Sequence, residues 1–537
     1  MSPSTLTLHR FSQPQTRAHE CGALQTLREF SWCVLLTLVA LLTAPSLTAA
    51  KPKDTLPDSF YDIDPAEAAQ NQHYNQPYRP QFHYTPMQGF VGDATGLIYD
   101  EGKYHLFYMS DKWERRKNRH KCWGYATSPD CLHWQEQPSI LDPVLDHKPG
   151  SGSGIVDWNN TLGLAMGAQK TLAVFYTDYK TGSCIAYSTN SGRDWVRHPR
   201  NPVLRGAGTD RDPVVFWYPP AAEWRLVRFD GKTGFAFYGS TNLLDWKYLS
   251  QVEGFNECPD FFELPVEGSA GQRKWVLMDA GFNYLIGTFD GRQFTAETDM
   301  LRGECAGSKS VYACQTWKRS PDNSTPPVQM AFLRYPPECQ LTWLNQMTFP
   351  CEVRLRKLPE GLRVCRQPIP GIESLRAEPK SWRDLTLKPG QDPLVGLHGD
   401  AFDIRAEVEL SEASSLVLSV RGETIRYPAA NRRKEKRLEA LGSSVPLSVS
   451  GNRLKLEVLV DRSSVEVFAD QGQVTLSKAC LFNPAKTNLS VTAEGGELRV
   501  NTLTVSRMKS IWSDPRMPGK SKGPAQAQTA KQTGEGG

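Results

Sequence analysis

Tyr125-Ala126-Thr127-Ser128, followed by Trp134, is the first copy of a unit that decides how this chain folds. Later copies keep a small or hydroxyl-bearing turn before an aromatic residue: Tyr187-Ser188-Thr189-Asn190 before Trp195, Tyr238-Gly239-Ser240-Thr241 before Trp246, and the degenerate Gly287-Thr288-Phe289-Asp290 before Phe294. The aromatic residue recurs about every 50 to 60 residues, a period that is typical of propeller blades built from short strands. We therefore expect five blades between about residues 80 and 370, with one large β-sandwich as the alternative.

A second region, from about residue 390 onward, has a different pattern. Its hydrophobic residues alternate strictly with polar ones in the stretches 402–410, 454–460 and 464–468. Such alternation predicts antiparallel strands with one buried face, and short strands separated by turns predict a sandwich. The sequence thus predicts an all-β protein, a five-bladed β-propeller followed by a β-sandwich. We expect the sandwich to support the propeller and to carry no chemistry.

The expected boundaries follow from these patterns and from composition. They are a lead-in at 51–79, the propeller at 80–370, a linker at 371–391, the sandwich at 392–512 and a disordered tail at 513–537, which is rich in Gly, Lys, Gln and Ala. At the other end, basic residues precede the apolar run 33–42, and small residues ending in Ala49-Ala50 follow it. This order predicts a signal peptide over 1–50, with an uncleaved anchor as the alternative. We expect a secreted or periplasmic protein that is free of the membrane after cleavage.

Charge and cysteine content limit the possible partners. The formal net charge is +4, from 62 basic and 58 acidic residues, and no basic face with interleaved aromatics is visible, so we expect no nucleic-acid partner. Ten of the twelve cysteines follow Ala50, without a CxxC pair or a His/Cys spacing suited to zinc. These cysteines can form disulfides or be buried as free thiols, and the sequence is compatible with both.

Three acidic residues occupy turns next to apolar, strand-like runs. Asp93 precedes the run 96–99, Asp212 precedes 214–218 and Glu257 precedes 261–264. Carboxylates placed in this way on successive sheets can converge on one pocket. Two converging carboxylates are what the cleavage of a glycosidic bond requires.

Around these acids the chain resembles glycoside hydrolase family 32, the invertase, inulinase and levanase group, from about Phe82 to Trp512. The segments that carry the resemblance are Gly89–Gly96 for the WMNDPNG block, Trp123–Ser128 for WGHATS, Ser151-Gly152-Ser153 for FSGS, Arg211-Asp212-Pro213 for RDP, Glu257-Cys258-Pro259 for ECP, Asn345–Pro350, and Val460–Phe468 in the sandwich. Any one of these triplets is weak, but their order and spacing together are specific.

The resemblance implies an active site in the central funnel of the propeller, acting on a carbohydrate. Asp93 would be the nucleophile, Glu257 the general acid/base and Asp212 a stabiliser of the transition state. From charge alone, Arg211 beside Asp212 can hold that carboxylate ionised. The substrate-binding residues that we expect beside them are Arg211, Trp123, Ser151, Tyr312 and Gln315, with blade core as the alternative for Trp123. No metal or organic cofactor is expected.

Some positions depart from the family's pattern. Gly92 stands where Asn is usual before the nucleophile, Met109 stands where Gln ends the next strand, and Gly150 replaces the aromatic residue of FSGS. Two polar contacts to a sugar are therefore missing. We expect a retaining hydrolase of β-fructofuranosidic bonds in a levan-like fructan or a related fructoside. A fructosyltransferase and a non-catalytic fructan-binding protein are the alternatives.

Overall fold

The structure, a computed structural model, describes residues 74–111, 121–143, 147–206, 208–232, 234–307, 309–317, 325–336, 339, 341–411, 414–429 and 436–513. These residues belong to one compact unit of the chain. The predicted signal peptide, the lead-in before residue 74 and the tail from residue 514 lie outside the described residues. Within this part of the chain no helix is long and apolar enough to cross a membrane.

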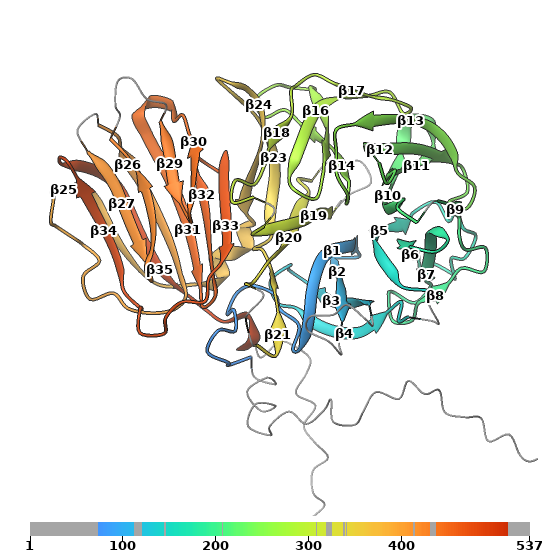
Figure 1. Cartoon of the computed structure of the whole chain (residues 1–537), viewed down its shortest axis with the longest axis horizontal. Helices are drawn as coiled ribbons and strands as arrows, with labels where there is room; N and C mark the ends of the chain where they lie inside the picture. Colours follow the sequence, from blue (N-terminus) through green and yellow to red (C-terminus); the bar gives the residue numbers. More distant parts are fainter. Residues whose placement is uncertain are drawn as a thin grey trace, which may run out of the picture. The chain divides into compact units, whose positions relative to one another are not determined.

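Five sheets succeed one another around a common centre and form the blades of a propeller (Figure 1). Blade I contains β21 (Trp343–Leu344), β1 (Gly89–Asp100), β2 (Lys103–Asp111), β3 (Cys122–Ser128) and β4 (Gln135–Ile140). Blade II contains β5 (Pro149–Asp157), β6 (Thr171–Asp178), β7 (Gly182–Ser188), β8 (Val196–Arg197) and β9 (Leu204–Arg205). Blade III contains β10 (Arg211–Tyr218), β11 (Glu223–Phe229), β12 (Gly234–Ser240) and β13 (Lys247–Glu253), with a 3-10 helix η2 at Pro219–Ala221.

The last two blades complete the ring. Blade IV contains β14 (Asp260–Pro265), β15 (Arg273–Met278), β16 (Asn283–Phe289), β17 (Phe294–Ala296) and β18 (Leu301–Arg302). Blade V contains β19 (Val311–Trp317), β20 (Val328–Leu333), β22 (Gln346–Met347), β23 (Cys351–Leu358) and β24 (Gly361–Pro368). Strand β21, which precedes β22 in the chain, pairs parallel with β1 and so joins the end of the propeller to its first blade.

The sequence repeat has a structural cause. In each of blades I to III a serine hydroxyl bonds the side chain of the Asx residue two positions later and fixes the turn: Ser128 with Asp130, Ser188 with Asn190 and Ser240 with Asn242. The tryptophan after each turn then packs its ring against the preceding blade: Trp134 on Trp317, Trp195 on Phe107 and Trp246 on Phe175. The recurring aromatic residue is therefore the contact that joins neighbouring blades, and the prediction of a propeller is confirmed.

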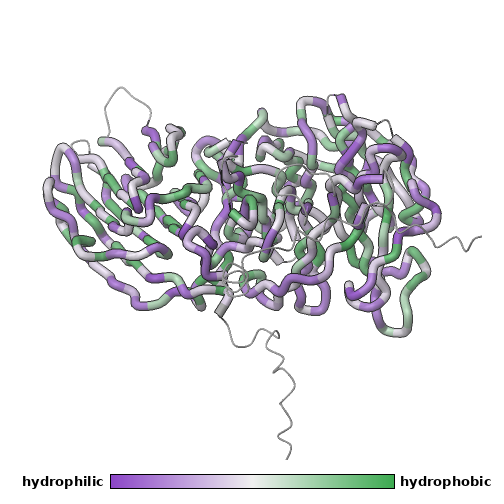
Figure 2. The backbone as a smooth tube through the Cα atoms, turned by 60° about the horizontal axis from the view of Figure 1, so that its bottom comes forward, coloured by the Kyte–Doolittle hydropathy of each residue, from purple (hydrophilic) through white to green (hydrophobic). Residues whose placement is uncertain are grey.

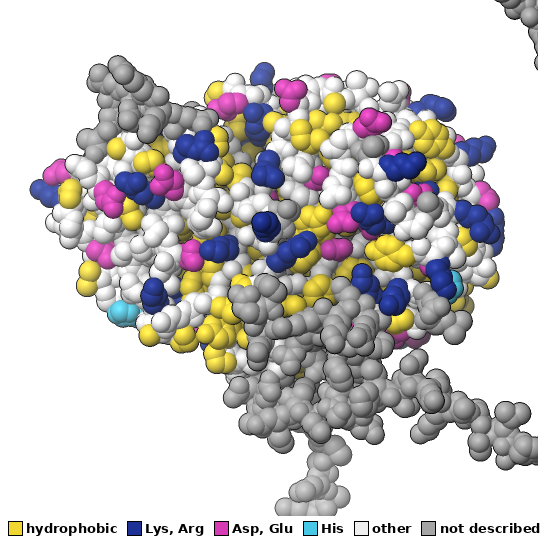
Figure 3. Space-filling model, in the orientation of Figure 1, with side chains coloured by type: hydrophobic (Ala, Val, Ile, Leu, Met, Phe, Trp, Pro, Cys, Tyr) yellow, Lys and Arg dark blue, Asp and Glu magenta, His cyan; other side chains and the backbone are white. Residues whose placement is uncertain are grey.

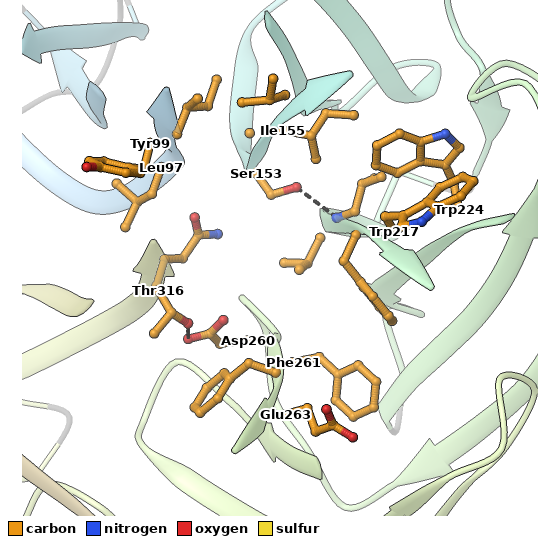
Figure 4. A pocket seen from close by; sticks show the side chains of 18 of the residues that line it. Leu97, Tyr99, Ser153, Ile155, Trp217, Trp224, Asp260, Phe261, Glu263 and Thr316 are labelled. Atoms are coloured by element: carbon orange, nitrogen blue, oxygen red, sulfur yellow. Dashed lines mark hydrogen bonds between the residues drawn. The ribbon is translucent and has the colours of Figure 1, made fainter. Parts of the chain in front are cut away.

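A cavity follows the propeller axis between the first strands of the blades (Figure 4). Its lining is mostly apolar and includes Leu97 of β1, Val215 of β10 and Phe261 of β14. Gln315 bonds the carbonyl of Gly152 across this axis. None of the three predicted catalytic acids is among the residues that line this cavity.

The sandwich consists of two sheets. One contains β25 (Arg376–Leu387), β35 (Leu498–Met508), β26 (Phe402–Glu409), β31 (Arg453–Asp461), β32 (Ser464–Ala469) and β33 (Val474–Ala479). The other contains β30 (Ser443–Pro446), β29 (Arg437–Ala440), β28 (Glu423–Tyr427), β27 (Ser415–Val420) and β34 (Leu489–Glu494). Short 3-10 helices η3 (Pro370–Leu375), η4 (Ser450–Asn452) and η5 (Ile511–Ser513) accompany these strands. Hydrophobic segments run through the interiors of propeller and sandwich, and hydrophilic ones lie at their edges (Figure 2).

The predicted linker at 371–391 is wrong. Most of it is strand β25, which pairs with β35 from Arg376 to Leu387 at the edge of the six-stranded sheet. Nearly all of its side chains are exposed or half-buried, with Leu387 the one buried at its end. An edge strand with so little burial does not need alternating hydrophobic residues, and this is why the sequence pattern did not reveal it.

Buried polar groups join the sandwich to the propeller. Asp461 of β31 accepts hydrogen bonds from the backbone N–H groups of Gln81 and Phe82, and its carboxylate lies 2.8 Å from Nδ1 of His83. The other ring nitrogen of His83 lies 2.8 Å from Glu466, which also accepts from the Phe349 N–H. The sandwich signature 460–468 therefore holds two propeller segments, as a supporting role requires.

The structure also shows the state of the cysteines. All ten that follow Ala50 are free thiols, and nine of them are buried. Of the two interpretations that the sequence left open, disulfides and buried free thiols, the structure has the second.

Candidate active site

β-Bulges interrupt the first strands of four blades near the predicted site residues. Register shifts occur between Val91 and Ala94 in β1, Pro149 and Gly152 in β5, Arg211 and Val214 in β10, and Tyr312 and Gln315 in β19. The shifts in β1, β5 and β10 span Asp93, Ser151 and Asp212. Because a bulge bends a strand and re-aims its side chains, these four irregularities turn polar groups toward one place. Asp212 and Cys258 also have left-handed backbones, with φ of 61° and 51°, a strain that is concentrated at functional sites in proteins.

The three predicted acids come together at these bulges. The hydroxyl of Ser151 donates to Oδ2 of Asp93 at 2.6 Å, and the backbone N–H of Cys258 donates to Oδ2 of Asp212 at 3.0 Å. The Cys258 thiol lies 3.8 Å from Asp93 Oδ2 and 3.5 Å from Asp212 Oδ2, so both carboxylates share this neighbour. Asp93 and Asp212 therefore both contact the residue that follows Glu257.

Glu257 is held by two side chains from neighbouring blades. Arg211 places Nε at 3.0 Å and Nη2 at 2.9 Å from Oε2 of Glu257, and the Tyr312 hydroxyl donates to Oε1 at 2.8 Å. The Glu257 side chain is 30 % exposed, whereas that of Asp212 is 4 % exposed. Glu257 thus reaches toward solvent above a buried aspartate. Acidic and basic side chains also gather near the centre of the propeller on the face shown in Figure 3.

Burial dominates the electrostatics of the two aspartates. It raises the pKa of Asp93, helped by the charge of Glu257 and opposed by the Ser151 hydrogen bond and the charges of Lys121 and Arg334. Burial and the charges of Asp93 and Glu257 raise the pKa of Asp212 to about 7, although Arg211 opposes them. Arg211 thus favours the ionised form of Asp212, as expected, but desolvation and two like charges outweigh one guanidinium and keep this pKa above its ordinary value. Burial likewise raises the pKa of the Cys258 thiol well above its ordinary value, which disfavours the thiolate that a cysteine nucleophile needs.

This pKa has a consequence for stability. The unfolded Asp212 carboxyl loses its proton near 3.8, whereas the folded one keeps it up to about 7. The folded state binds the extra proton in that window, so wild-type stability falls as pH rises from 4 to 7. We expect Asp212→Asn to raise the melting temperature by a few degrees at pH 8 and to change it little at pH 4. Thermal unfolding of both proteins across this range checks the prediction, and an equal difference at both pH values would contradict it.

Comparison with known proteins identifies the family of the chain. The glycosyl hydrolases family 32 N-terminal domain profile matches residues 83–368, and the family 32 C-terminal profile matches residues 371–507. The chain belongs to glycosyl hydrolase family 32. A levanase of Bacillus subtilis is 31 % identical over 494 residues, which cover 83 % of this chain and 73 % of that protein.

Two further proteins are similar to this chain over most of its length. An extracellular exo-inulinase of Aspergillus ficuum is 25 % identical over 522 residues, covering 82 % of this chain and 96 % of the relative. The crystal structure of exo-inulinase from Aspergillus awamori superimposes with a TM-score of 0.73 at 23 % identity, covering 82 % of this chain and all of the other. This last likeness shows the shared fold.

Among the described residues no group of three or more His, Cys, Asp or Glu side chains is placed to hold a metal.

For two of the predicted sugar-binding residues of this family 32 chain, the hydrogen bonds of the described residues lead to backbone carbonyls and not to the acids. Trp123 is fully buried, packs in the core between blades I and II, and donates its indole N–H to the carbonyl of Gly150. It is therefore blade core, and its prediction as a sugar platform is wrong. Gln315 is buried on the axis, where it bonds the Gly152 carbonyl. Ser151, Arg211 and Tyr312 do contact the acids.

The departures from the family 32 pattern are accommodated by packing. A Cβ added at Gly92 would lie 2.7 Å from the Phe90 ring and 3.3 Å from Cβ of Met109, which is itself buried. Glycine and methionine here thus make room for one another and for Phe90. The polar contacts that Asn and Gln would offer at these positions are replaced by an apolar wall.

The structure also adds residues that the motifs did not indicate. Tyr179 and Lys121 lie near Asp93, and Arg334 stacks on the Tyr312 ring at 4.4 Å from its centroid. Asn256 donates to the Tyr312 hydroxyl at 3.3 Å. Asn256 adjoins the Glu257 motif and was within reach of sequence reasoning. Arg334, Lys121 and Tyr179 come from other strands and turns, and no spacing in the sequence relates them to the acids.

Proposed function

We propose that this chain hydrolyses β-fructofuranosidic bonds in fructans, with levan as its first substrate. The observation that carries the proposal is the meeting of Asp93, Asp212 and Glu257 around Cys258 in a family 32 chain. A fructosyl bond breaks through an oxocarbenium-like state that needs one carboxylate to attack and another to move a proton. Levanases and exo-inulinases among the relatives support the choice of a fructan.

We assign each acid a role in this reaction. A carboxylate oxygen of Asp93 attacks the anomeric carbon, and the bond from that carbon to the bridging oxygen breaks as Glu257 gives its proton to the departing sugar. Water then attacks the anomeric carbon of this ester, Glu257 takes a proton from the water, and the bond from that carbon to Asp93 breaks, so that Asp93 leaves as a carboxylate. Ser151 positions Asp93, while Arg211 and Tyr312 fix Glu257 by their hydrogen bonds. Asp212 contacts the hydroxyl groups of the fructosyl unit and stabilises its charge.

A sugar-release screen tests the function. Purified protein is incubated with levan, inulin, sucrose and an unrelated β-glucan, and the products are separated by anion-exchange chromatography. Free fructose or short fructo-oligosaccharides from levan support hydrolysis. Longer oligomers at high substrate concentration would indicate a fructosyltransferase, and binding without products would indicate a non-catalytic protein.

The role of Glu257 gives a distinct prediction. Glu257→Gln keeps the size of the side chain but has no proton to give. We expect kcat/KM on levan to fall by about 10²–10⁴-fold, the usual contribution of a general acid. On an aryl fructoside, whose leaving group departs without a proton, the first step should recover and leave only the slower second step. An equal loss on both substrates would contradict the acid/base assignment.

Export is the remaining part of the proposal. The basic residues, the apolar run 33–42 and the small residues up to Ala50 favour a cleaved signal, and one relative is named an extracellular exo-inulinase. N-terminal sequencing of protein from the culture medium or periplasm should begin near Lys51. Recovery of an intact N-terminus from the cytosol would contradict export.

A further inference from the structure

Gly150 leaves a space beside the catalytic acids that a tyrosine from another turn fills. A Cβ added at Gly150 would lie 2.8 Å from the hydroxyl oxygen of Tyr179 and 2.9 Å from two of its ring carbons. Gly150 directly precedes Ser151, whose hydroxyl holds Asp93. The Tyr179 ring therefore packs onto the backbone at the position where the FSGS block has its aromatic side chain, and no larger residue fits at 150 while Tyr179 stays in place.

Tyr179 lies at the open end of the site. It belongs to the turn between β6, which ends at Asp178, and β7, which begins at Gly182, and this turn closes the hairpin next to β5. The residue is 39 % exposed although it is large and apolar. Partial burial, followed by the negative charges of Asp212 and Asp93, raises the pKa of its phenol, so the ring is neutral and close to both acids. The ammonium group of Lys121 lies 5.7 Å from the ring centroid.

A half-exposed neutral ring beside buried carboxylates is suited to a sugar. Aromatic side chains line carbohydrate and other ligand pockets because they offer a flat apolar face, and tyrosine adds a polar tip. The sugar that is attacked must lie against Asp93, below the rim. Glu257, which is 30 % exposed, must reach the bridging oxygen, so the next sugar lies on the solvent side of the scissile bond, where the half-exposed Tyr179 is available to it.

We propose that Tyr179 is the specificity-determining aromatic wall of this site, supplied by the β6–β7 turn in place of residue 150, and that it contacts the sugar on the leaving-group side of the scissile bond. This inference rests on the proposed function. It gives the chain a preference for fructosides that carry a second sugar over fructosides with a small aglycone.

Two substrates that share the fructosyl unit test the inference. Levanbiose carries a second sugar beyond the scissile bond, and methyl β-D-fructofuranoside does not. We expect Tyr179→Ala to lower kcat/KM on levanbiose roughly fivefold to tenfold, mainly through KM, the size expected for the loss of one aromatic contact. On the methyl fructoside the change should be under about twofold. Tyr179→Phe, which keeps the ring, should behave as wild type on both.

Two further variants separate a local contact from general damage. Gly150→Phe combined with Tyr179→Ala returns an aromatic ring from the neighbouring position, and part of the levanbiose activity should return with it. Tyr248→Ala removes a tyrosine that is 58 % exposed on β13, away from the acids, and should change neither substrate. An equal loss on both substrates, no loss on levanbiose, or a Tyr179→Phe variant as impaired as Tyr179→Ala would overturn the inference. Failure of the proposed function is a separate result, because wild-type protein would then cleave neither substrate.

Discussion

Asp93→Asn is expected to abolish turnover on every fructoside while leaving the fold and substrate binding intact. An amide at this position cannot form the sugar ester, and it stays uncharged where the nucleophile must be an anion. Removal of a residue that acts as nucleophile costs on the order of 10⁴-fold or more in kcat. The amide can still accept the hydrogen bond that Ser151 donates to Oδ2 of Asp93. Initial rates on levan and on an aryl fructoside measure the loss.

The aryl fructoside distinguishes Asp93 from Glu257. An activated leaving group removes the need for a proton but not the need for a nucleophile, so Asp93→Asn should show no recovery on it. Ser151→Ala is a matched variant that keeps the nucleophile and removes one hydrogen bond, and it should lose far less activity than Asp93→Asn. An Asp93→Asn protein with more than a few per cent of wild-type rate would remove Asp93 from the nucleophile role.

The second large effect concerns the joint between propeller and sandwich. Asp461→Ala leaves the buried His83 and the N–H groups of Gln81 and Phe82 without their acceptor. Removing one partner of a buried ion pair costs about 3–5 kcal/mol of unfolding free energy. Denaturant unfolding followed by tryptophan fluorescence measures the loss. Asp245→Ala, which breaks an ion pair with Arg200 whose side chains are both more than half exposed, is the matched control and should have no measurable effect.

The same joint predicts how stability depends on pH. Burial lowers the pKa of His83, but its hydrogen bonds to Asp461 and Glu466 outweigh burial and raise the pKa to about 9. A raised histidine pKa stabilises the folded state fully below the ordinary value of 6.5, and this stabilisation is lost as pH rises through about 9. Wild-type protein should therefore lose stability between pH 7 and 10, and His83→Gln should be less stable at pH 6 and flatter over that range. Parallel curves for the two proteins would contradict the assignment.

Much of the fold could be predicted because the residues that repeat in the sequence are the ones that shape the blades and join them. The serines fix the turns, and the aromatic residues after them hold one blade to the next, so the spacing of this unit is the spacing of the blades. The three acids were also predictable, since each precedes an apolar run of a first strand that is visible in the sequence. The signature 460–468 was visible too, but its partners His83 and Phe349 become apparent only in three dimensions.

The errors have physical reasons. Trp123 lies on β3, where blade core and site-facing positions have the same composition, and the ring turned out to pack at Gly96, where an added Cβ would lie 2.5 Å from it. For Asp212 the sequence shows the neighbouring Arg211 but not the burial that raises its pKa. Tyr179 depends on how the β6–β7 hairpin meets β5. The only trace of it in the sequence is the glycine at 150, where an aromatic residue is missing.

The most direct test of the central claim is to trap the fructosyl ester on Asp93. Glu257→Gln should form the ester rapidly from p-nitrophenyl β-D-fructofuranoside and hydrolyse it slowly, because the first step needs no proton and the second lacks its base. After an acid quench and proteolysis, peptide mass spectrometry should find one anhydrohexose on the peptide that contains Asp93, at the aspartate side chain. An adduct on Asp212 or Glu257, or release of p-nitrophenol with inversion at the anomeric carbon, would contradict the account.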